Sequence, residues 1–495
     1  MIRDFARRAV SAFGYDIVEP TNKRKRIVNR IGREDYQLKG QKHRQAQASA
    51  AELQRNLSLV GWMVRRHLDY VSTFQFRSRT GDKQFDKYVE RLMAEDNRPN
   101  NADASGKFTR EKLFRLAEMR RVLDGDVFFV KLNNGTLQGI QGDLVRDPPD
   151  MTPDDSESWI NGISVNEFGR PKRFAVWRRR GYSDIDFLRS VRAQNVIQYG
   201  FFDRFATDQV RGVSPMISAL APLQDVYENF NYALAKAKVS QLFAVSFFRE
   251  ASGQLGELTS QYGTQADLNG DELAEPTQYD VNFGDSPQVF DLDAGDRAEF
   301  LESKSPSGEF QNFTQAVIGV ALKSLDIPFS FFDESWTNFY GSRAAALNYN
   351  RAAQDKRDDQ IQMRRQYTVW KYQQWIAKGW LPPVSINDLA FEWIPTGIPW
   401  WDPAKEIKGN VDAIAAGLDT PQRVCRSTGS DFYENIDEIA AAIEYAKEKG
   451  VDVSFTVDDE SLAGQSQPVD ATEVDENENE QTQNETEVAS DEISR

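Results

Sequence analysis

The sequence contains few of the residues that most often carry out chemistry. One cysteine, Cys425, stands among 495 residues. An intramolecular disulfide is therefore excluded, and the composition fits a protein assembled in a reducing cytoplasm. The two histidines, His43 and His67, are not near Cys425 at any recognisable spacing. Lys107-Phe108-Thr109 lacks the upstream glycine of a phosphate loop. We therefore predict no catalytic residues, no cofactor and no metal site.

Long apolar runs are also missing. No stretch of about 18 consecutive apolar residues occurs, and residues 1–8 lack the apolar run of a secretory signal. We therefore expect neither export nor a membrane span. A chain of 495 residues with 40% hydrophobic content can nevertheless build two or more cores, or one core with protruding modules.

Acidic charge is present in excess, but it is concentrated at one end. Residues 451–495 hold fourteen Asp and Glu residues against Arg495 alone, so this tail carries −13 of the net −16 and the preceding residues carry only −3. Because the tail has little apolar material, we predict a disordered segment. The alternative is that its charge keeps neighbouring tails or DNA apart. Residues 1–45 are basic, and Asn22-Lys23-Arg24-Lys25-Arg26 is either part of an arm lying on a neighbouring subunit or a nucleic-acid contact.

The first half of the chain predicts helices followed by a β region. A stripe of apolar residues at spacings of three and four predicts a core-facing helix over 46–70. A second helix is expected over 109–122, stopped by Asp124-Gly125. The run 126–130 followed by Asn133-Asn134-Gly135 indicates a hairpin, and 162–165 and 168–177 extend the β region. The chain is therefore of the α+β class, dominated by helix.

A long helix is expected after Ser214-Pro215, where serine can cap free amides and proline suits the first turn. Its apolar residues follow a 3.5-residue seam typical of helices packed along their length: Met216, Leu220, Leu223, Tyr227, Phe230, Leu234 and Ala237. Pro222 predicts a kink near Ala219 or a restart of the helix. Residues 249–308 then resemble a small β-containing module inserted between two helices.

The second of these helices is predicted over 310–325, with Phe313, Val317, Val320, Ala321 and Leu325 on one side. It should end before Ile327-Pro328, because a residue before proline disfavours the α region.

An aromatic stretch over 329–340 is expected to form a loop packed on the core, before a helix over 342–378 whose charges can pair with one another at helical spacings. Further helices are expected from Pro403, from Thr420-Pro421 and around Ile436–Ile443.

Three segments carry a family resemblance: Arg211-Gly212-Val213-Ser214-Pro215, Asn338-Phe339-Tyr340-Gly341-Ser342-Arg343-Ala344, and Trp400-Trp401-Asp402-Pro403-Ala404-Lys405-Glu406. In this order and at these distances they resemble the lambda-type portal family of tailed bacteriophages, over roughly residues 45–450. The third segment is the most specific. In the second, Tyr340-Gly341-Ser342 departs from the small-residue run of the family pattern.

The resemblance implies a portal fold with wing, stem, clip and crown modules, assembled as a dodecameric ring. The implied order is a basic arm (1–45), wing (46–212), first stem helix (213–248), clip (249–308), second stem helix (309–326), tunnel loop (327–341), long helix (342–378), wing return (379–402), crown (403–450) and acidic tail (451–495). The residues that the resemblance assigns to the tunnel loop or to DNA contact are Asn338, Phe339, Tyr340, Ser342 and Arg343. From the residues themselves, Arg343 either touches phosphate or pairs with a carboxylate to fix the loop.

The function that the resemblance implies is a channel at a single capsid vertex for DNA packaging and ejection, assembled in the host cytoplasm and retained in the virion. The implied partners are the terminase large subunit, major capsid and scaffolding proteins, head-tail connector or neck proteins, and double-stranded DNA bound without sequence specificity. ATP hydrolysis is expected in a separate terminase, not in this chain. The alternatives are another capsid-associated structural protein or an acid-based DNA-processing enzyme.

Overall fold

The computed structural model describes residues 32–38, 41–149, 158–181, 184–242, 245–249, 296–300, 308–335, 337–385, 389–397 and 403–453. The beginning of the basic arm, most of the module over 249–308, Trp400 to Asp402, and the acidic tail beyond 453 lie outside the described residues. The chain divides into two compact units, one of Met1–Thr73 and Ser78–Phe391, the other of Phe74–Arg77 and Glu392–Arg495. The expected α+β class, dominated by helix, is confirmed.

Helices α3 (Gln41–Asn56), α4 (Ser58–Val71) and α7 (Arg110–Asp124) surround the first core of the larger unit. The helix expected over 46–70 is two helices, because Leu57 adopts an extended conformation between them. Its apolar stripe is core as predicted. The region assigned to the arm contains α2 (Glu34–Gln37) and the start of α3.

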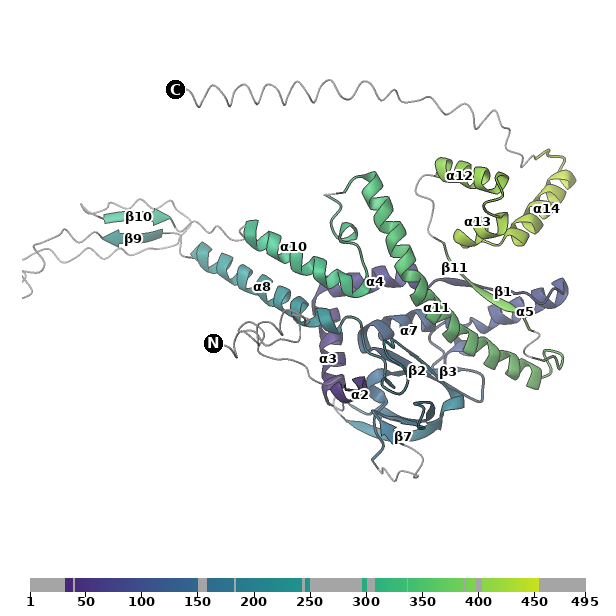
Figure 1. Ribbon diagram of the computed structural model, residues 1–495, viewed down its shortest axis with the longest axis horizontal. Coiled ribbons are helices and arrows are strands. Elements are labelled where there is room, and N and C mark those ends of the chain that lie inside the picture. The colour runs from purple at the N-terminus through teal and green to yellow at the C-terminus, as the bar shows by residue number, and fades with distance from the viewer. Residues whose placement is uncertain are drawn as a thin grey trace, which may run out of the picture. The chain divides into compact units, whose positions relative to one another are not determined.

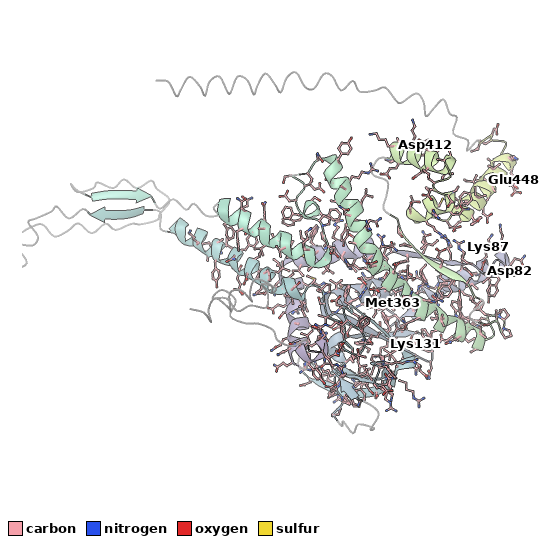
Figure 2. The ribbon with its side chains drawn as sticks, in the orientation of Figure 1. Asp82, Lys87, Lys131, Met363, Asp412 and Glu448 are labelled. Atoms are coloured by element: carbon pink, nitrogen blue, oxygen red, sulfur yellow. The ribbon has the colours of Figure 1, made fainter. Side chains whose placement is uncertain are left out.

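Helix α7 follows the sequence prediction closely. Thr109 caps its first turn by accepting a hydrogen bond from the Lys112 amide, and Gly125 ends it at a φ of 90° that disfavours any residue with a side chain. The sequence analysis missed α5 (Lys83–Asp96), whose N-terminus is capped by Asp82 (Figure 2), and the short α6 (Pro99–Ala102).

Two antiparallel sheets form the β region. One has the order β3-β2-β8, with β2 (Asp126–Lys131), β3 (Leu137–Gln141) and β8 (Val196–Gly200). Gly135 turns the β2–β3 hairpin at a φ of 97°, as the Asn-Gly pair predicts. The other has the order β4-β5-β6-β7, with β4 (Ser158–Ile160), β5 (Ile163–Val165), β6 (Pro171–Arg179) and β7 (Ile185–Arg192). A second core, which includes Phe128, Phe174 and Val196, joins the two sheets.

A helical hairpin projects from the larger unit (Figure 1). Its helices are α8 (Ile217–Leu242) and α10 (Gly308–Leu322), and the pair β9 (Val245–Arg249) and β10 (Asp296–Phe300) continues it. Helix α8 is unbroken through Pro222, so a restart at that residue is wrong. Helix α10 ends before Ile327-Pro328 as predicted, through the 3-10 turn Lys323–Leu325.

The longest helix is α11 (Phe339–Ala377), which spans about 58 Å at ~1.5 Å per residue. It begins three residues earlier than predicted, because the Asn338 side chain caps it by accepting a hydrogen bond from the Gly341 amide at 2.8 Å. Large side chains such as Met363 (Figure 2) and Tyr367 anchor it in the larger unit.

The smaller unit contains three helices and all but one residue of each strand of a two-stranded sheet, β1 (Phe74–Ser78) and β11 (Phe391–Pro395). The helices are α12 (Pro403–Ala415), α13 (Pro421–Ser427) and α14 (Phe432–Glu448), which confirms the expected trio. None of the described residues of these helices is fully buried, and Ile436 on the predicted stripe of α14 is 48% exposed.

Candidate functional site

The end of the segment expected to form the tunnel loop lies at the start of α11. Asn338 is the cap of this helix, so Phe339 and Tyr340 lie in its first turn instead of preceding it, and Ser342 and Arg343 lie at the start of the helix as predicted. Tyr340 is 73% exposed and Arg343 is half-buried. The Ser342 hydroxyl donates a hydrogen bond to the Thr337 hydroxyl at 3.2 Å. Phe339 begins the helix, and its side chain lies outside the description.

The aromatic residues before this turn anchor it to the first core, as the sequence predicts for a loop packed on the core. Phe329 and Phe331 are half-buried against that core. The Phe331 ring stacks on Tyr70 of α4 at 5.8 Å between centroids and meets Tyr349 of α11 edge-on at 5.6 Å. Phe332 remains 40% exposed although it contacts Trp62 of α4. The start of α11 is therefore supported by the body of the larger unit.

The helical hairpin is buried at its base and exposes apolar side chains farther out. Met216, just before α8, and Leu223 of α8 belong to the first core, and Val226 is only 2% exposed. The rest of the predicted seam is open, since Phe230 is 47% and Leu234 is 55% exposed. The outer parts of the two helices are held together in part by Phe230 and Phe310, whose rings meet edge-on at 6.1 Å.

The face of α10 that packs on the core differs in part from the predicted one, although Ala321 and, just beyond the helix, Leu325 are buried as predicted. Its buried residues are Thr314, Ile318, Ala321 and Leu322. Phe313 and Val320, which were predicted to lie on the packed side, are 57% and 68% exposed. Together with Phe230, Tyr232 and Leu234 of α8 they form a set of exposed apolar residues that we call the hairpin stripe. A set of exposed apolar residues of this kind is typical of a surface that another protein covers.

The segment before α8 fixes the root of the hairpin. The buried guanidinium of Arg211 donates to both oxygens of the Asp126 carboxylate, at 2.6 and 2.8 Å. Its remaining donors reach the backbone carbonyl oxygens of Gly142 (2.7 Å), Val145 (2.9 Å) and Asn161 (2.6 Å). Arg211 therefore ties the entrance of α8 to both sheets, and we call this arrangement the arginine lock.

Neighbouring residues make the arginine lock compact. A Cβ atom added at Gly212 would overlap the Gly125 carbonyl group, so these two backbones approach closely only because residue 212 has no side chain. The Ser214 hydroxyl donates to the Val122 carbonyl at 2.5 Å and accepts from the Met216 amide at 3.1 Å, as expected of a capping serine. His43 lies 3.4 Å from the Gly212 carbonyl, where burial and the charge of Arg211 lower its pKa to about 4.

A second buried cluster joins α4, α7, β8 and α11. The Arg121 guanidinium donates to the Tyr199 hydroxyl at 2.7 Å, lies over the Phe201 ring at 3.7 Å and pairs with Asp359. His67 lies 2.8 Å from the Glu118 carboxylate. Burial opposes ionisation of Glu118, but Arg121 beside it lowers its pKa to about 2. No signal in the sequence distinguished these residues from ordinary helical charges.

The charges of α11 pair mainly with other elements. Lys356 reaches Asp326 at 2.6 Å, Arg364 reaches Glu111 of α7 at 2.8 Å, and Lys371 pairs with Asp96 of α5. The prediction that most of them pair within the helix is therefore wrong for these residues. They fix the long helix against the body of the larger unit.

The described residues contain neither a metal-binding cluster nor a membrane-spanning helix. Among them, no group of three or more His, Cys, Asp or Glu side chains is arranged to hold a metal ion. No helix in the described part of the chain combines the length and the apolar character that a membrane crossing requires.

Comparisons with known proteins point to one family. A family model described as "Phage portal protein, lambda family" matches residues 22–357, well over half of the chain. No curated protein matches the chain.

Solved structures with a similar chain include necks of gene transfer agent (GTA) particles and an HK97-family phage portal protein. A chain in the neck of a native GTA particle, computed with C12 symmetry, is 12% identical, with a TM-score of 0.41, over 77% of this chain and 93% of that one. A chain in the neck of an empty GTA particle, computed with C6 symmetry, is 13% identical, with a TM-score of 0.42 and the same coverage. An HK97-family phage portal protein from Corynebacterium diphtheriae is 12% identical, with a TM-score of 0.27, over 60% of this chain and 82% of that one.

Proposed function

The chain belongs to the lambda family of phage portal proteins, and from this premise we propose that it assembles into a closed dodecameric ring at a single capsid vertex. DNA enters the capsid through this ring during packaging and leaves through it during ejection. The protein is a structural component of the virion, and its assembly takes place in the host cytoplasm. The ATP hydrolysis that drives packaging belongs to a separate terminase.

The hairpin stripe is the observation that supports assembly best. Tyr232, Phe313 and Val320 are 69%, 57% and 68% exposed, although they lie on helices whose bases are anchored in a core. Covering apolar surface contributes about 25 cal/mol per Å², so a second copy packed on these side chains would stabilise a ring. In this proposal α8 and α10 are the stem helices, and each hairpin contacts the hairpins on either side.

Each module of the portal fold is assigned its own binding partners in this proposal. The clip beyond β9 and β10 docks the terminase large subunit and later the head-tail connector or neck proteins. The wing, which includes both sheets, contacts the major capsid and scaffolding proteins, and the three C-terminal helices form the crown. Double-stranded DNA passes without sequence-specific contact, because passage requires weak binding to phosphate.

The first turn of α11 is the proposed point of DNA contact. Asn338 and Ser342 fix the turn, and the aromatic residues before it hold its position. Phe339 belongs to the same turn. Tyr340 is exposed and Arg343 half-buried there, so one aromatic and one cationic side chain would lie at the channel surface. Whether Arg343 touches phosphate or fixes the turn is decided by the variant described in the Discussion.

Electron microscopy and mass photometry of the purified protein test the ring. We expect closed rings with a central hole for the wild type, and loss of rings for the double variant Phe313→Glu/Val320→Glu. Phe205→Glu is the matched control, since this aromatic residue is 87% exposed but lies outside the hairpin. Monomers and dimers alone in the wild type would contradict the proposal, and so would intact rings in the double variant.

A further inference from the structure

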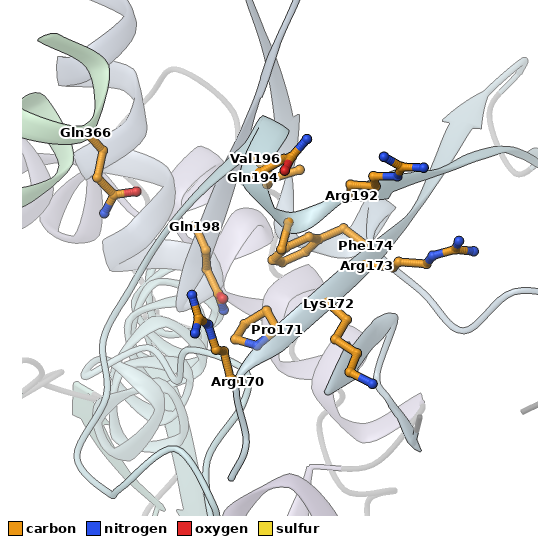
Figure 3. A pocket seen from close by; sticks show the side chains of 11 residues that line it. Arg170, Pro171, Lys172, Arg173, Phe174, Arg192, Gln194, Val196, Gln198 and Gln366 are labelled. Atoms are coloured by element: carbon orange, nitrogen blue, oxygen red, sulfur yellow. The ribbon is translucent and has the colours of Figure 1, made fainter. Parts of the chain in front are cut away.

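A hollow of about 610 Å³ lies against the four-stranded sheet and is lined from β6, β7, β8 and α11 (Figure 3). Four of its lining residues are cations: Arg170, Lys172, Arg173 and Arg192. None of its lining residues is Asp or Glu. We call this site the basic hollow.

Two of the cations in the basic hollow lie opposite each other on neighbouring strands, an arrangement that is unfavourable in a sheet. Arg173 on β6 and Arg192 on β7 are direct cross-strand partners, and like charges in such positions destabilise a sheet. Figure 3 shows their side chains extending in the same direction. Within the described part of the chain neither has a carboxylate partner, whereas Arg179 and Arg180 at the other end of β6 pair with Asp143 and Asp186. Arg173 and Arg192 therefore bring two adjacent like charges to the hollow, which an anionic ligand would neutralise.

We infer that the basic hollow binds the acidic segment 454–495, from the same copy or from a neighbouring one. This segment carries thirteen Asp and Glu residues against Arg495, while the residues before 451 are nearly neutral. Its 42 residues can extend to about 140 Å, so length does not limit binding. Attachment to the same ring raises its effective concentration far above that of a free acidic protein.

The shape and lining of the hollow favour a peptide over DNA. Gln194 and Gln366 offer amide donors and acceptors that suit a peptide backbone, and Pro171, Phe174 and Val196 supply an apolar floor. A hollow of about 610 Å³ accepts a few residues of an extended chain. Duplex DNA binds instead through cations spread along its two phosphate backbones.

Photocrosslinking in the full-length ring tests this inference. The exposed Gln194 is replaced by p-benzoylphenylalanine, the protein is irradiated in about 0.05 M NaCl, and the crosslinked peptides are identified by mass spectrometry. We expect crosslinks to residues 454–495, and a loss of about three- to ten-fold in Arg173→Gln/Arg192→Gln, since each exposed ion pair contributes about 0.2–1 kcal/mol. Arg178→Gln is the matched control, because Arg178 is an exposed cation on β6 that does not line the hollow.

The remaining outcomes overturn the inference. These are no crosslinked product, crosslinks to another part of the chain, and crosslinks to 454–495 that are unchanged in Arg173→Gln/Arg192→Gln. A duplicate sample receives an equal mass of duplex DNA. Transfer of the crosslink from the acidic segment to the DNA would make the hollow a nucleic-acid site instead. Circular dichroism confirms that each variant is folded, which we expect because both substituted arginines are exposed.

Discussion

Removing Arg211 from the arginine lock should be among the most damaging single substitutions in the larger unit. Its guanidinium makes five hydrogen bonds, two to Asp126 and three to backbone carbonyl oxygens, and Asp126 is fully buried. Arg211→Met leaves that carboxylate without its countercharge, and breaking a buried pair costs about 3–5 kcal/mol. Arg211→Lys keeps the charge but has only three donors and no fork, so we expect a loss of about 2 kcal/mol.

The assay is urea unfolding followed by tryptophan fluorescence, at a protein concentration low enough to keep subunits apart. Arg204→Met is the matched control. Arg204 pairs with Glu34 at 3.1 Å but is 38% exposed, so its loss should cost no more than about 1 kcal/mol. The double variant Arg211→Met/Asp126→Leu should be much less destabilised than the sum of the two single variants, because no buried charge is left unpaired. A loss below about 1 kcal/mol for Arg211→Met, or strict additivity in the double variant, would refute this account of the lock.

Three further predictions concern acid stability, DNA contact and the tail. Because the pKa of His43 is lowered to about 4, the unfolded chain takes up a proton there before the folded one does, so His43 should contribute a loss of up to about 3 kcal/mol as the pH falls from 6.5 to 4. His43→Gln should lack that loss when the free energy of unfolding is measured by urea titration at each pH. Burial raises the pKa of Asp124 to about 6, which changes the stability in the opposite direction. This effect is the same in both proteins and cancels when they are compared. Arg343→Ala should leave rings assembled and impair packaging or genome retention; normal full-length packaging excludes the DNA contact, and failed assembly favours a structural role. Deleting residues 451–495 should leave rings intact in micrographs, and loss of the folded body would show that this segment contributes to the fold.

Local signals predicted the elements whose stabilising contacts lie close in sequence. Thr109 and Gly125 bound α7, Asn134-Gly135 turns the β2–β3 hairpin, and Ser214 caps the approach to α8. Each of these features involves a few consecutive residues, which a sequence displays directly. The apolar stripe over 46–70 was likewise predicted from the sequence to face the core, but the break in the helix at Leu57 was not predicted.

The sequence was least informative where a partner is distant in sequence or where two faces of a helix are apolar. Lys356, Arg364 and Lys371 find their partners on other elements, and nothing in α11 itself identifies those partners. In α10, apolar residues lie both on the core side and on the hairpin stripe, so periodicity could not tell which face packs within the subunit. The candidate residues around Arg343 were found through the family resemblance, and the cap at Asn338 then placed them on a helix.

The arginine lock also implies an order in which parts of the larger unit can fold during synthesis. Every group that receives a hydrogen bond from the Arg211 guanidinium, at residues 126, 142, 145 and 161, precedes Arg211 in the chain. A ribosome therefore releases the complete set of acceptors before the arginine and before either helix of the hairpin. Because domains generally fold from the N-terminus as they emerge, both sheets can pair first and receive Arg211 afterwards. The hairpin would then be built on a root whose two sheets are already paired.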